Sequence, residues 1–299
     1  MNRRTFLSSA ASLAAFLGVN ALVGCRPHFG GLTVGSKNFT EQLILGELLA
    51  QYLEQQLRVT VDRRFYLAGT YICHQALLSG RIDTYVEYTG TALAAVLKEK
   101  PAFDHAQVFD LVRREYARRL GLEVMPSLGF DNSFAMVMRG AEAREKHLSK
   151  LSQLAPFAPQ MRMGVGYEFL ERPDGYKGLV ARYHLKFAEA PRVMDLGLLY
   201  RALESRQVDI VAGSNTDGLI AALDLVVLED DLHYFPPYDA VPIVRRAALE
   251  KYSGLRAAFD RLAGRITAQD MRRMNYAVDG EKKDPSLVVQ DFLRGRGLA

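Results

Sequence analysis

A repeated segment is the feature of this chain that most constrains its fold. The sequence ALLSGRID at Ala76–Asp83 matches ALESRQVD at Ala202–Asp209 in register, and continuing that register sets Tyr88 opposite Ser214. A segment that recurs within one chain predicts two structural units with the same plan. Chance similarity between two segments that each join a helix to a strand remains an alternative.

The repeat extends in both directions. Downstream, Thr91 falls opposite Asp217, so that Thr91–Leu97 and Asp217–Leu223 match as small apolar helices. Upstream, Val34–Lys37 has a looser counterpart in Val165–Glu168. If the repeat is real, the chain forms two like lobes, each with a loop at the carboxyl ends of its strands. Ligands of open α/β sheets bind at such loops, so two facing loops predict a cleft.

Strand and helix patterns alternate after the N-terminal region. We expect strands at Leu32–Gly35, around Val59 and Val61, and at Ile82–Val86, with a helix at Thr70–Leu78. Such alternation is typical of an open α/β sheet with mostly parallel strands.

A longer helix is expected between the first two strands. Asn38 can cap it, and Glu41 three residues later can complete a capping box. Its apolar side chains recur at the spacing of one buried face, at Leu45, Leu48, Leu49, Tyr52 and Leu53.

The N-terminus has the features of an export signal. Arg3 and Arg4 precede a mostly apolar stretch, which ends at a lipobox-like sequence before Cys25. We therefore expect residues 1–24 to be a twin-arginine-like signal peptide, Cys25 to be lipidated and residues 25–31 to form a tether. An uncleaved membrane anchor is the alternative, although the apolar stretch is short for crossing a bilayer.

Composition and spacing argue against several classes of function. The chain has 38 basic and 34 acidic residues among 299, so no nucleic-acid partner is expected. The arginine run at 113–119 fits a solvated helix face. The six histidines lack metal-ligand spacing, and Cys73 fits a buried thiol. No catalytic constellation is present, so we expect neither an enzyme nor a metal or organic cofactor.

Three segments combine aromatic residues with turn chemistry: Tyr85–Thr91, Leu128–Phe134 and Tyr234–Asp239. Aromatic faces attract a methylated cation through the ring quadrupole. Any one such segment is more often explained by core or turn packing, so the segments are informative only together.

In combination, these and other motifs resemble the substrate-binding proteins of ABC importers for glycine betaine, proline betaine and choline. The matching segments are Lys37–Gln42, Tyr85–Thr91, Glu171–Gly175, Leu228–Asp231, Pro236–Asp239, Met274–Tyr276 and Glu281–Asp284. The resemblance implies an α/β fold of the two-lobed periplasmic-binding-protein type (type II-like), hinged, with its ligand in the interlobe cleft. We expect lobe 1 to comprise residues 32–132 plus 238–299 and lobe 2 residues 133–237.

The resemblance also implies a ligand site. Family members hold a quaternary ammonium group in a box of four tyrosines and bind the carboxylate with basic and hydroxyl groups. The ligand-binding positions are Tyr88, Phe134, Ser214 and Tyr238 in the box, Lys37, Thr91 and Arg172 at the carboxylate, and Asn132 at a neighbouring acidic position. Ser214 lacks a ring and removes one wall. The alternatives are a more polar ligand that uses Ser214, Asn215 and Asp217, and ion pairs of the basic residues with Glu168 or Glu171.

The function expected from these features is that of a lipid-anchored solute-binding protein outside the cytoplasm, at the periplasmic or cell-surface face of the membrane. It would bind a betaine-like zwitterion as a monomer and deliver it to an ABC permease with its ATPase. Choline, carnitine or ergothioneine as the ligand, a role as ligand-sensing partner of a membrane signalling protein, and an enzyme on a binding-protein scaffold remain alternatives.

Overall fold

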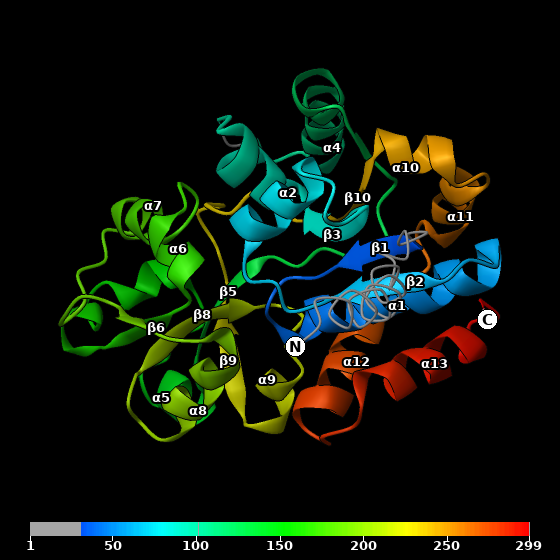
Figure 1. The fold of residues 1–299 in the computed structure, drawn as a ribbon. Helices are drawn as coiled ribbons and strands as arrows, with labels where there is room; N and C mark the ends of the chain where they lie inside the picture. The colour runs from blue at the N-terminus through cyan, green and yellow to red at the C-terminus, as the bar shows by residue number, and fades with distance from the viewer. Residues whose placement is uncertain (1–30, 101, 299) are drawn as a thin grey trace, which may run out of the picture. The chain divides into compact units, whose positions relative to one another are not determined.

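The computed structural model describes residues 31–100 and 102–298. The expected signal peptide, the lipidation site Cys25 and nearly all of the tether lie outside these residues. From Leu32 onward the chain forms one compact unit. It is built around two five-stranded sheets with helices packed on them (Figure 1). The expectation of an α/β fold with two like lobes is confirmed.

Sheet 1 has the strand order β2-β1-β3-β10-β4. Its strands are β1 (Leu32–Gly35), β2 (Val61–Arg64), β3 (Thr84–Tyr88), β4 (Leu122–Val124) and β10 (Ala240–Arg245). β1 is parallel to β2 and β3, whereas β10 is antiparallel to both of its neighbours. Strand β3 begins at Thr84, two residues after the expected start at Ile82, and β2 begins at Val61.

Sheet 2 repeats this plan with the order β7-β6-β8-β5-β9. Its strands are β5 (Phe134–Arg139), β6 (Met163–Val165), β7 (Arg192–Val193), β8 (Ile210–Ser214) and β9 (Leu225–Leu228). β6 is parallel to β7 and β8, and β5 is antiparallel to β8 and β9. β10 and β5 thus take the same place in the two sheets, although they come from distant parts of the chain.

The repeated segments make the same backbone hydrogen bonds. Their equivalent bonds are Arg81 N to Ala76 O and Gln207 N to Ala202 O, both 2.9 Å, and Asp83 N to Thr33 O and Asp209 N to Arg162 O, both 2.8 Å. The repeat is therefore structural. The upstream match is wrong by two residues. Val34 pairs with Thr84 in β3, and the equivalent residue of β8, Ile210, pairs with Met163 and not with Val165.

Helices cover both sheets. Lobe 1, the part of the chain around sheet 1, contains α1 (Thr40–Leu57), α2 (Thr70–Leu78), α3 (Thr89–Thr91), α4 (His105–Glu115), α10 (Arg246–Lys251), α11 (Leu255–Leu262), α12 (Ala268–Asp279) and α13 (Pro285–Gly295). Lobe 2, around sheet 2, contains α5 (Gly140–Glu145), α6 (Tyr167–Glu171), α7 (Tyr176–Arg182), α8 (Leu199–Glu204) and α9 (Leu219–Ala222). α3 continues into a π-helical segment, Ala92–Leu97.

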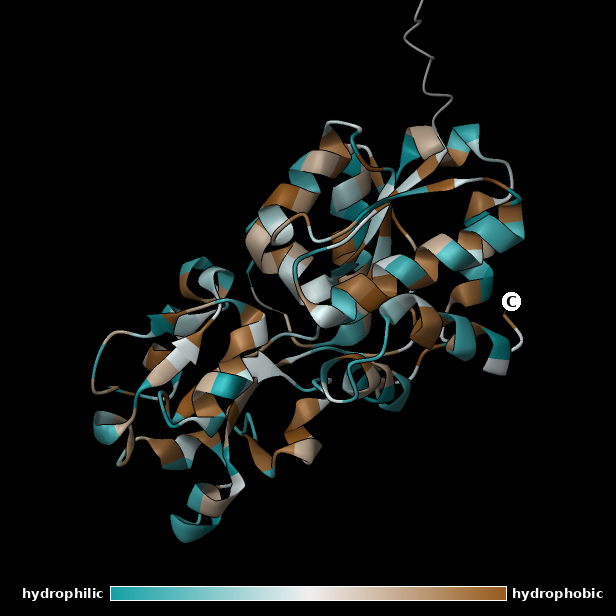
Figure 2. Ribbon diagram, turned by 60° about the horizontal axis from the view of Figure 1, so that its bottom comes forward, coloured by the Kyte–Doolittle hydropathy of each residue, from teal (hydrophilic) through white to brown (hydrophobic). Residues whose placement is uncertain are grey.

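The expected buried face of α1 is confirmed, since all five of its predicted apolar residues are buried. α1 packs against α11, α12 and α13, and Figure 2 shows hydrophobic and hydrophilic residues alternating along the helices. The expected capping box is wrong. Phe39 is the N-cap residue, and no side chain caps the helix. Glu41 instead points into the boundary between the lobes, as described below.

Two segments connect the lobes. The first, before β5, includes Asn132, and the second, before β10, includes Tyr238. They lie side by side, because Asn132 N donates to Tyr238 O over 3.0 Å and Asp131 forms an isolated antiparallel bridge with Asp239. We keep the expected lobe boundaries as a proposal. Among the described residues, no helix is both long and apolar enough to cross a membrane.

Candidate functional site

The eight residues predicted to bind a ligand lie where the two lobes meet. Those of lobe 1 are Lys37 after β1, Tyr88 at the end of β3, Thr91 in α3, and Asn132 and Tyr238 in the connecting segments; those of lobe 2 are Phe134 in β5, Arg172 after α6 and Ser214 at the end of β8. Hydrogen bonds, ring contacts or strand pairing link them to one another or to shared neighbours. Their distribution therefore agrees with one site at the carboxyl ends of the parallel strands.

Arg172 joins the two lobes. Its Nη1 donates to Thr91 Oγ1 over 2.9 Å, and its Nε and Nη2 bind the Asp174 carboxylate. Tyr238 donates its hydroxyl hydrogen to the same carboxylate over 2.6 Å. Arg172 and Asp174 are both buried. Arg172 does have an acidic partner in the chain, but this partner is neither Glu168 nor Glu171.

Aromatic rings surround the Arg172 guanidinium. Its Cζ lies 5.0 Å from the Phe134 ring centroid and 5.8 Å from that of Tyr238. Phe134 also packs against Phe169 and Phe235, with centroid distances of 4.8 and 5.6 Å. This cluster can face a cation with several ring surfaces. Phe169 was not predicted, and Phe235 was predicted only as part of an aromatic segment.

Lys37 lies on the lobe 1 side and is buried. Its ammonium group pairs with the buried Glu87 carboxylate and lies 4.8 Å from the Tyr88 ring centroid. Lys37, like Arg172, therefore has an internal carboxylate partner. The two cations therefore bring no excess positive charge to this site, because the Glu87 and Asp174 carboxylates balance them.

Glu41 lies between the lobes and does not take the capping role expected from its spacing. One carboxylate oxygen accepts hydrogen bonds from the Tyr88 hydroxyl and the Asn132 amide, both 2.6 Å long. The other accepts from the hydroxyl of Thr216, in lobe 2, and from the Asn275 amide. All four donors are neutral. Burial raises the pKa of Glu41, and these hydrogen bonds only partly oppose that effect.

A second overlooked residue follows in the chain. Gln42 is buried beside Tyr88, but neither of its amide atoms has hydrogen-bonding geometry with any part of the chain that the structure describes. A buried polar group without a partner is costly, so Gln42 is a candidate to bind a ligand or water. The KNFTEQ motif contained both Glu41 and Gln42, and the only sequence signal was their place next to Lys37.

Ser214 occupies in sheet 2 the place that Tyr88 occupies in sheet 1, as the repeat predicts. Ser214 pairs with Phe134 at the start of β5, and Tyr88 pairs with Ala240 at the start of β10. The Ser214 hydroxyl lies 3.0 Å from the Thr216 hydroxyl. Asp217, three residues later, accepts hydrogen bonds from the Tyr200 hydroxyl and from Ser214 N. The Asp217 carboxylate therefore binds partners within its own lobe. The Ser214 hydroxyl contacts Thr216, whose hydroxyl donates to Glu41.

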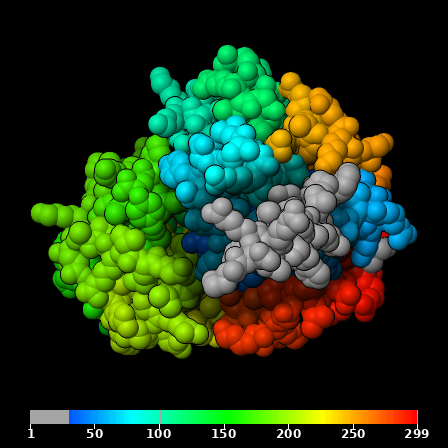
Figure 3. Space-filling view, in the orientation of Figure 1, coloured from blue at the N-terminus to red at the C-terminus, as the bar shows by residue number. Residues whose placement is uncertain are grey.

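The lobes also touch outside this group of residues. A Cβ on Gly69, before α2, would lie only 2.1 Å from Glu168 Oε1, and one on Gly218 would lie 2.3 Å from Tyr276 N. In Figure 3 the green and yellow surface of lobe 2 meets the cyan and red surfaces of lobe 1. The Gly218 contact requires glycine, since a Cβ there would meet the backbone of Tyr276, whereas the Glu168 carboxylate is the end of a flexible side chain that can move away from Gly69.

Comparison with known proteins identifies the relatives of this chain. Residues 30–295 match the family described as the substrate binding domain of ABC-type glycine betaine transport systems. The chain is 32% identical to the carnitine transport binding protein OpuCC of Listeria monocytogenes, over 90% of this chain and 89% of the relative. It is 34% identical to the ergothioneine transport permease/ergothioneine binding protein EgtU of Helicobacter pylori, over 89% of this chain and 48% of that longer protein.

A solved structure shows the same fold. A protein described as a glycine betaine/carnitine/choline ABC transporter is 30% identical and superimposes with a TM-score of 0.74. The match covers 89% of this chain and 99% of that chain.

Proposed function

The chain belongs to the family of substrate-binding domains of ABC-type glycine betaine transport systems, and from this we propose that it binds a betaine-like zwitterion outside the cytoplasm and delivers it to a permease driven by an ATPase. It binds and releases this ligand without catalysing a reaction. The gathering of the eight predicted residues between the lobes carries the proposal, because a ligand there contacts both lobes at once.

The charge balance of the site supports a ligand with a cationic group. Lys37 pairs with Glu87 and Arg172 with Asp174, so these four residues sum to zero charge. Glu41 adds a carboxylate whose donors are all neutral. A quaternary ammonium group would supply the missing positive charge, and the Tyr88 and Tyr238 rings offer it π faces.

The hydrogen-bonding capacity of Arg172 supports a carboxylate at the other end of the ligand. A guanidinium carries five N–H donors. Three of them are used, one each from Nε, Nη1 and Nη2. Among the described residues this leaves one N–H on each Nη, and both can donate to a carboxylate of the ligand. A zwitterion matches both features, whereas choline lacks the carboxylate.

The proposed mechanism is ligand-driven closure. Hydrogen bonds already cross between the lobes at Arg172–Thr91, Tyr238–Asp174 and Thr216–Glu41. A ligand that contacts both lobes adds to these bonds only when the lobes are together, so it shifts the population toward the closed form. We propose that the permease recognises this form and that Cys25 anchors the protein to the membrane through a lipid.

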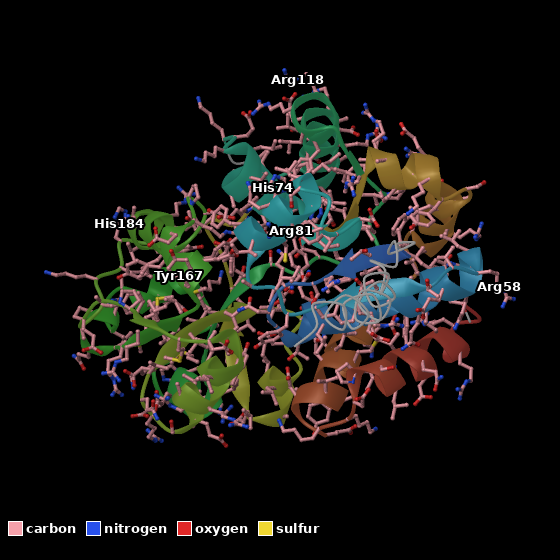
Figure 4. The ribbon with its side chains drawn as sticks, in the orientation of Figure 1. Arg58, His74, Arg81, Arg118, Tyr167 and His184 are labelled. Atoms are coloured by element: carbon pink, nitrogen blue, oxygen red, sulfur yellow. The ribbon has the colours of Figure 1, made fainter. Side chains whose placement is uncertain are left out.

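The test is calorimetry of the purified protein with glycine betaine, carnitine, ergothioneine and choline. Replacing Tyr88, Tyr238 or Arg172 by alanine is expected to weaken binding of the preferred ligand at least tenfold. Each replacement removes a π contact or a charge-assisted hydrogen bond, contributions of roughly 0.5–3 kcal/mol each. The matched control is Arg81→Ala, since Arg81 is exposed before the start of β3, at the opposite end from Tyr88 (Figure 4).

The control variant is expected to keep the affinity of the unchanged protein. Unchanged affinity in all three site variants would remove the assignment. Thermal unfolding of each variant is measured in parallel, because Arg172→Ala also leaves Asp174 as a buried carboxylate without its cation.

A further inference from the structure

A cluster of possible metal ligands lies at the connecting segments, outside the proposed betaine site. It consists of His105, Asp131 and Asp239, whose potential ligand atoms all lie within 4.8 Å of one another. His105 is the first residue of α4, and the two aspartates stand on the two connecting segments. The ligands thus come from three separate stretches of chain that the fold brings together.

The two aspartates face each other unfavourably unless a cation joins them. They are direct partners in an antiparallel bridge, a position where like charges on one face of the chain are destabilising. The one basic group in the cluster is the His105 imidazole, whose Nδ1 lies 2.8 Å from Asp239 Oδ2.

The carboxylates retain capacity to bind a cation. Asp131 accepts one backbone N–H on each oxygen, from Ser133 and from Tyr238. A carboxylate has about four lone-pair positions, so two remain on Asp131. The only side-chain partner that the described structure gives Asp239 is His105. The cluster is open to solvent, since the His105 side chain is 61% exposed and that of Asp239 19%.

We propose that His105, Asp131 and Asp239 form a binding site for one divalent transition-metal ion, of which Zn²⁺ is the best match. Imidazole and carboxylate ligands suit zinc, with bond lengths of roughly 2.0–2.2 Å. Ligand atoms on a tetrahedral zinc are about 3.4 Å apart, so the three side chains, now within 4.8 Å of one another, would adjust their positions to bind the ion. Water completes the coordination. The bound ion ties α4 to both connecting segments.

The test is zinc titration of the full chain, purified without a tag and freed of metal, followed by calorimetry. One zinc per chain is expected. His105→Ala and Asp239→Asn are expected to weaken binding at least tenfold, because each removes one of three protein ligands. The control is His184→Ala, since His184 is also exposed but lies in lobe 2 (Figure 4). It is expected to bind zinc as the unchanged protein does.

Cobalt substitution gives a second measurement. The absorption spectrum of bound Co²⁺ should lack the thiolate charge-transfer band, and His105→Ala should abolish the d–d bands. Thiolate absorption would assign the ion to a cysteine and overturn the proposal. So would an unchanged zinc affinity in His105→Ala, or an equal loss in His184→Ala. His105 is exposed on a helix end, so its replacement tests the site even if Asp239→Asn folds poorly.

Discussion

The two lobes are alike at the amino ends of their parallel strands and differ at the carboxyl ends. At the amino ends, Asp83 in lobe 1 accepts a backbone hydrogen bond from Thr33 in β1 over 2.9 Å, and Asp209 in lobe 2 accepts one from Arg162, directly before β6, over 2.8 Å. Each also pairs with an arginine at the end of the antiparallel strand, Arg245 or Arg139. The fold repeats even its side-chain partners here.

At the carboxyl ends the repeat register joins unlike residues. Tyr88 stands opposite Ser214, and Thr91, which accepts from Arg172, stands opposite Asp217, which is bound within its own lobe. The repeated ends hold each sheet together, and the divergent ends carry residues of the proposed site. Replacing equivalent residues at the amino ends should therefore change the free energy of unfolding similarly in the two lobes wherever burial is similar. Replacing equivalent residues at the carboxyl ends should change ligand affinity differently.

The largest expected effect tests the two arginines at the repeated ends. Arg139 binds the Leu203 and Val208 carbonyls, Glu142 and Asp209, and its side chain is 11% exposed. Within the described part of the chain, Arg245 binds Asp83 and, at 3.5 Å, a carbonyl, and its side chain is 29% exposed. Replacement of Arg139 by methionine should cost about 3 kcal/mol of unfolding free energy, and that of Arg245 about 1 kcal/mol.

Urea unfolding of both variants measures this difference. Equal losses would show that burial does not set the energetic difference between the two repeats and that their contacts matter alike. A ligand titration of each folded variant serves as the control, because both arginines lie far along the strands from the site residues and should leave affinity unchanged.

The second prediction concerns the pH dependence that lobe 2 has and lobe 1 lacks at equivalent positions. Burial raises the pKa of Asp217 to about 7, against the opposing hydrogen bonds from Tyr200 and Ser214. The folded protein therefore binds this proton more tightly than the unfolded chain does. The resulting stabilisation is complete below about pH 4 and is lost as the pH rises through 7. Thr91, at the equivalent position of lobe 1, has no ionisable side chain and so gives no such pH dependence.

Asp217→Asn should remove this dependence. Between pH 4.5 and 8, the free energy of unfolding of the unchanged protein should fall by on the order of 2 kcal/mol more than that of the variant. Unfolding in urea across this range measures it. Glu41, whose pKa is also raised, is present in both proteins, and its charge is one of the causes that raise the pKa of Asp217. Parallel curves would show that Asp217 titrates in its ordinary range.

The fold was predictable because its signals are local. The apolar periodicity of α1 and the helix at Thr70–Leu78 depend on residues close in the chain, and the repeat is visible in two short segments that can be aligned directly. All three are present in the structure. The register from the repeat also placed Ser214 correctly, since strands have a strict period. The looser upstream match failed by two residues, because β1 and β6 share few residue types that could fix the alignment.

Side-chain partners were less predictable, because they depend on the path of the chain in space. Glu41 fits a capping box by spacing, but burial between the lobes directs it to four donors from other elements. Arg172 had three nearby carboxylates in sequence, and the turn between α6 and α7 brings Asp174 to it. His105, Asp131 and Asp239 form no recognisable ligand motif in the sequence, because they come from three separate segments that meet only in the fold.

The smallest expected effect decides what the missing ring at Ser214 means for the ligand. If the ligand presents a methylated cation, the Ser214 hydroxyl gains nothing from it, and Ser214→Ala should change affinity less than threefold. If the ligand presents N–H or O–H donors there, the hydroxyl accepts one, and the same variant should lose about tenfold, the worth of one hydrogen bond. Calorimetry with the preferred ligand distinguishes these results. Ser205→Ala, an exposed serine of the same repeat, is the control. A tenfold loss of affinity confined to Ser214→Ala would indicate a ligand with a more polar head group than a quaternary ammonium. The proposed site between the two lobes would be unaffected by that result.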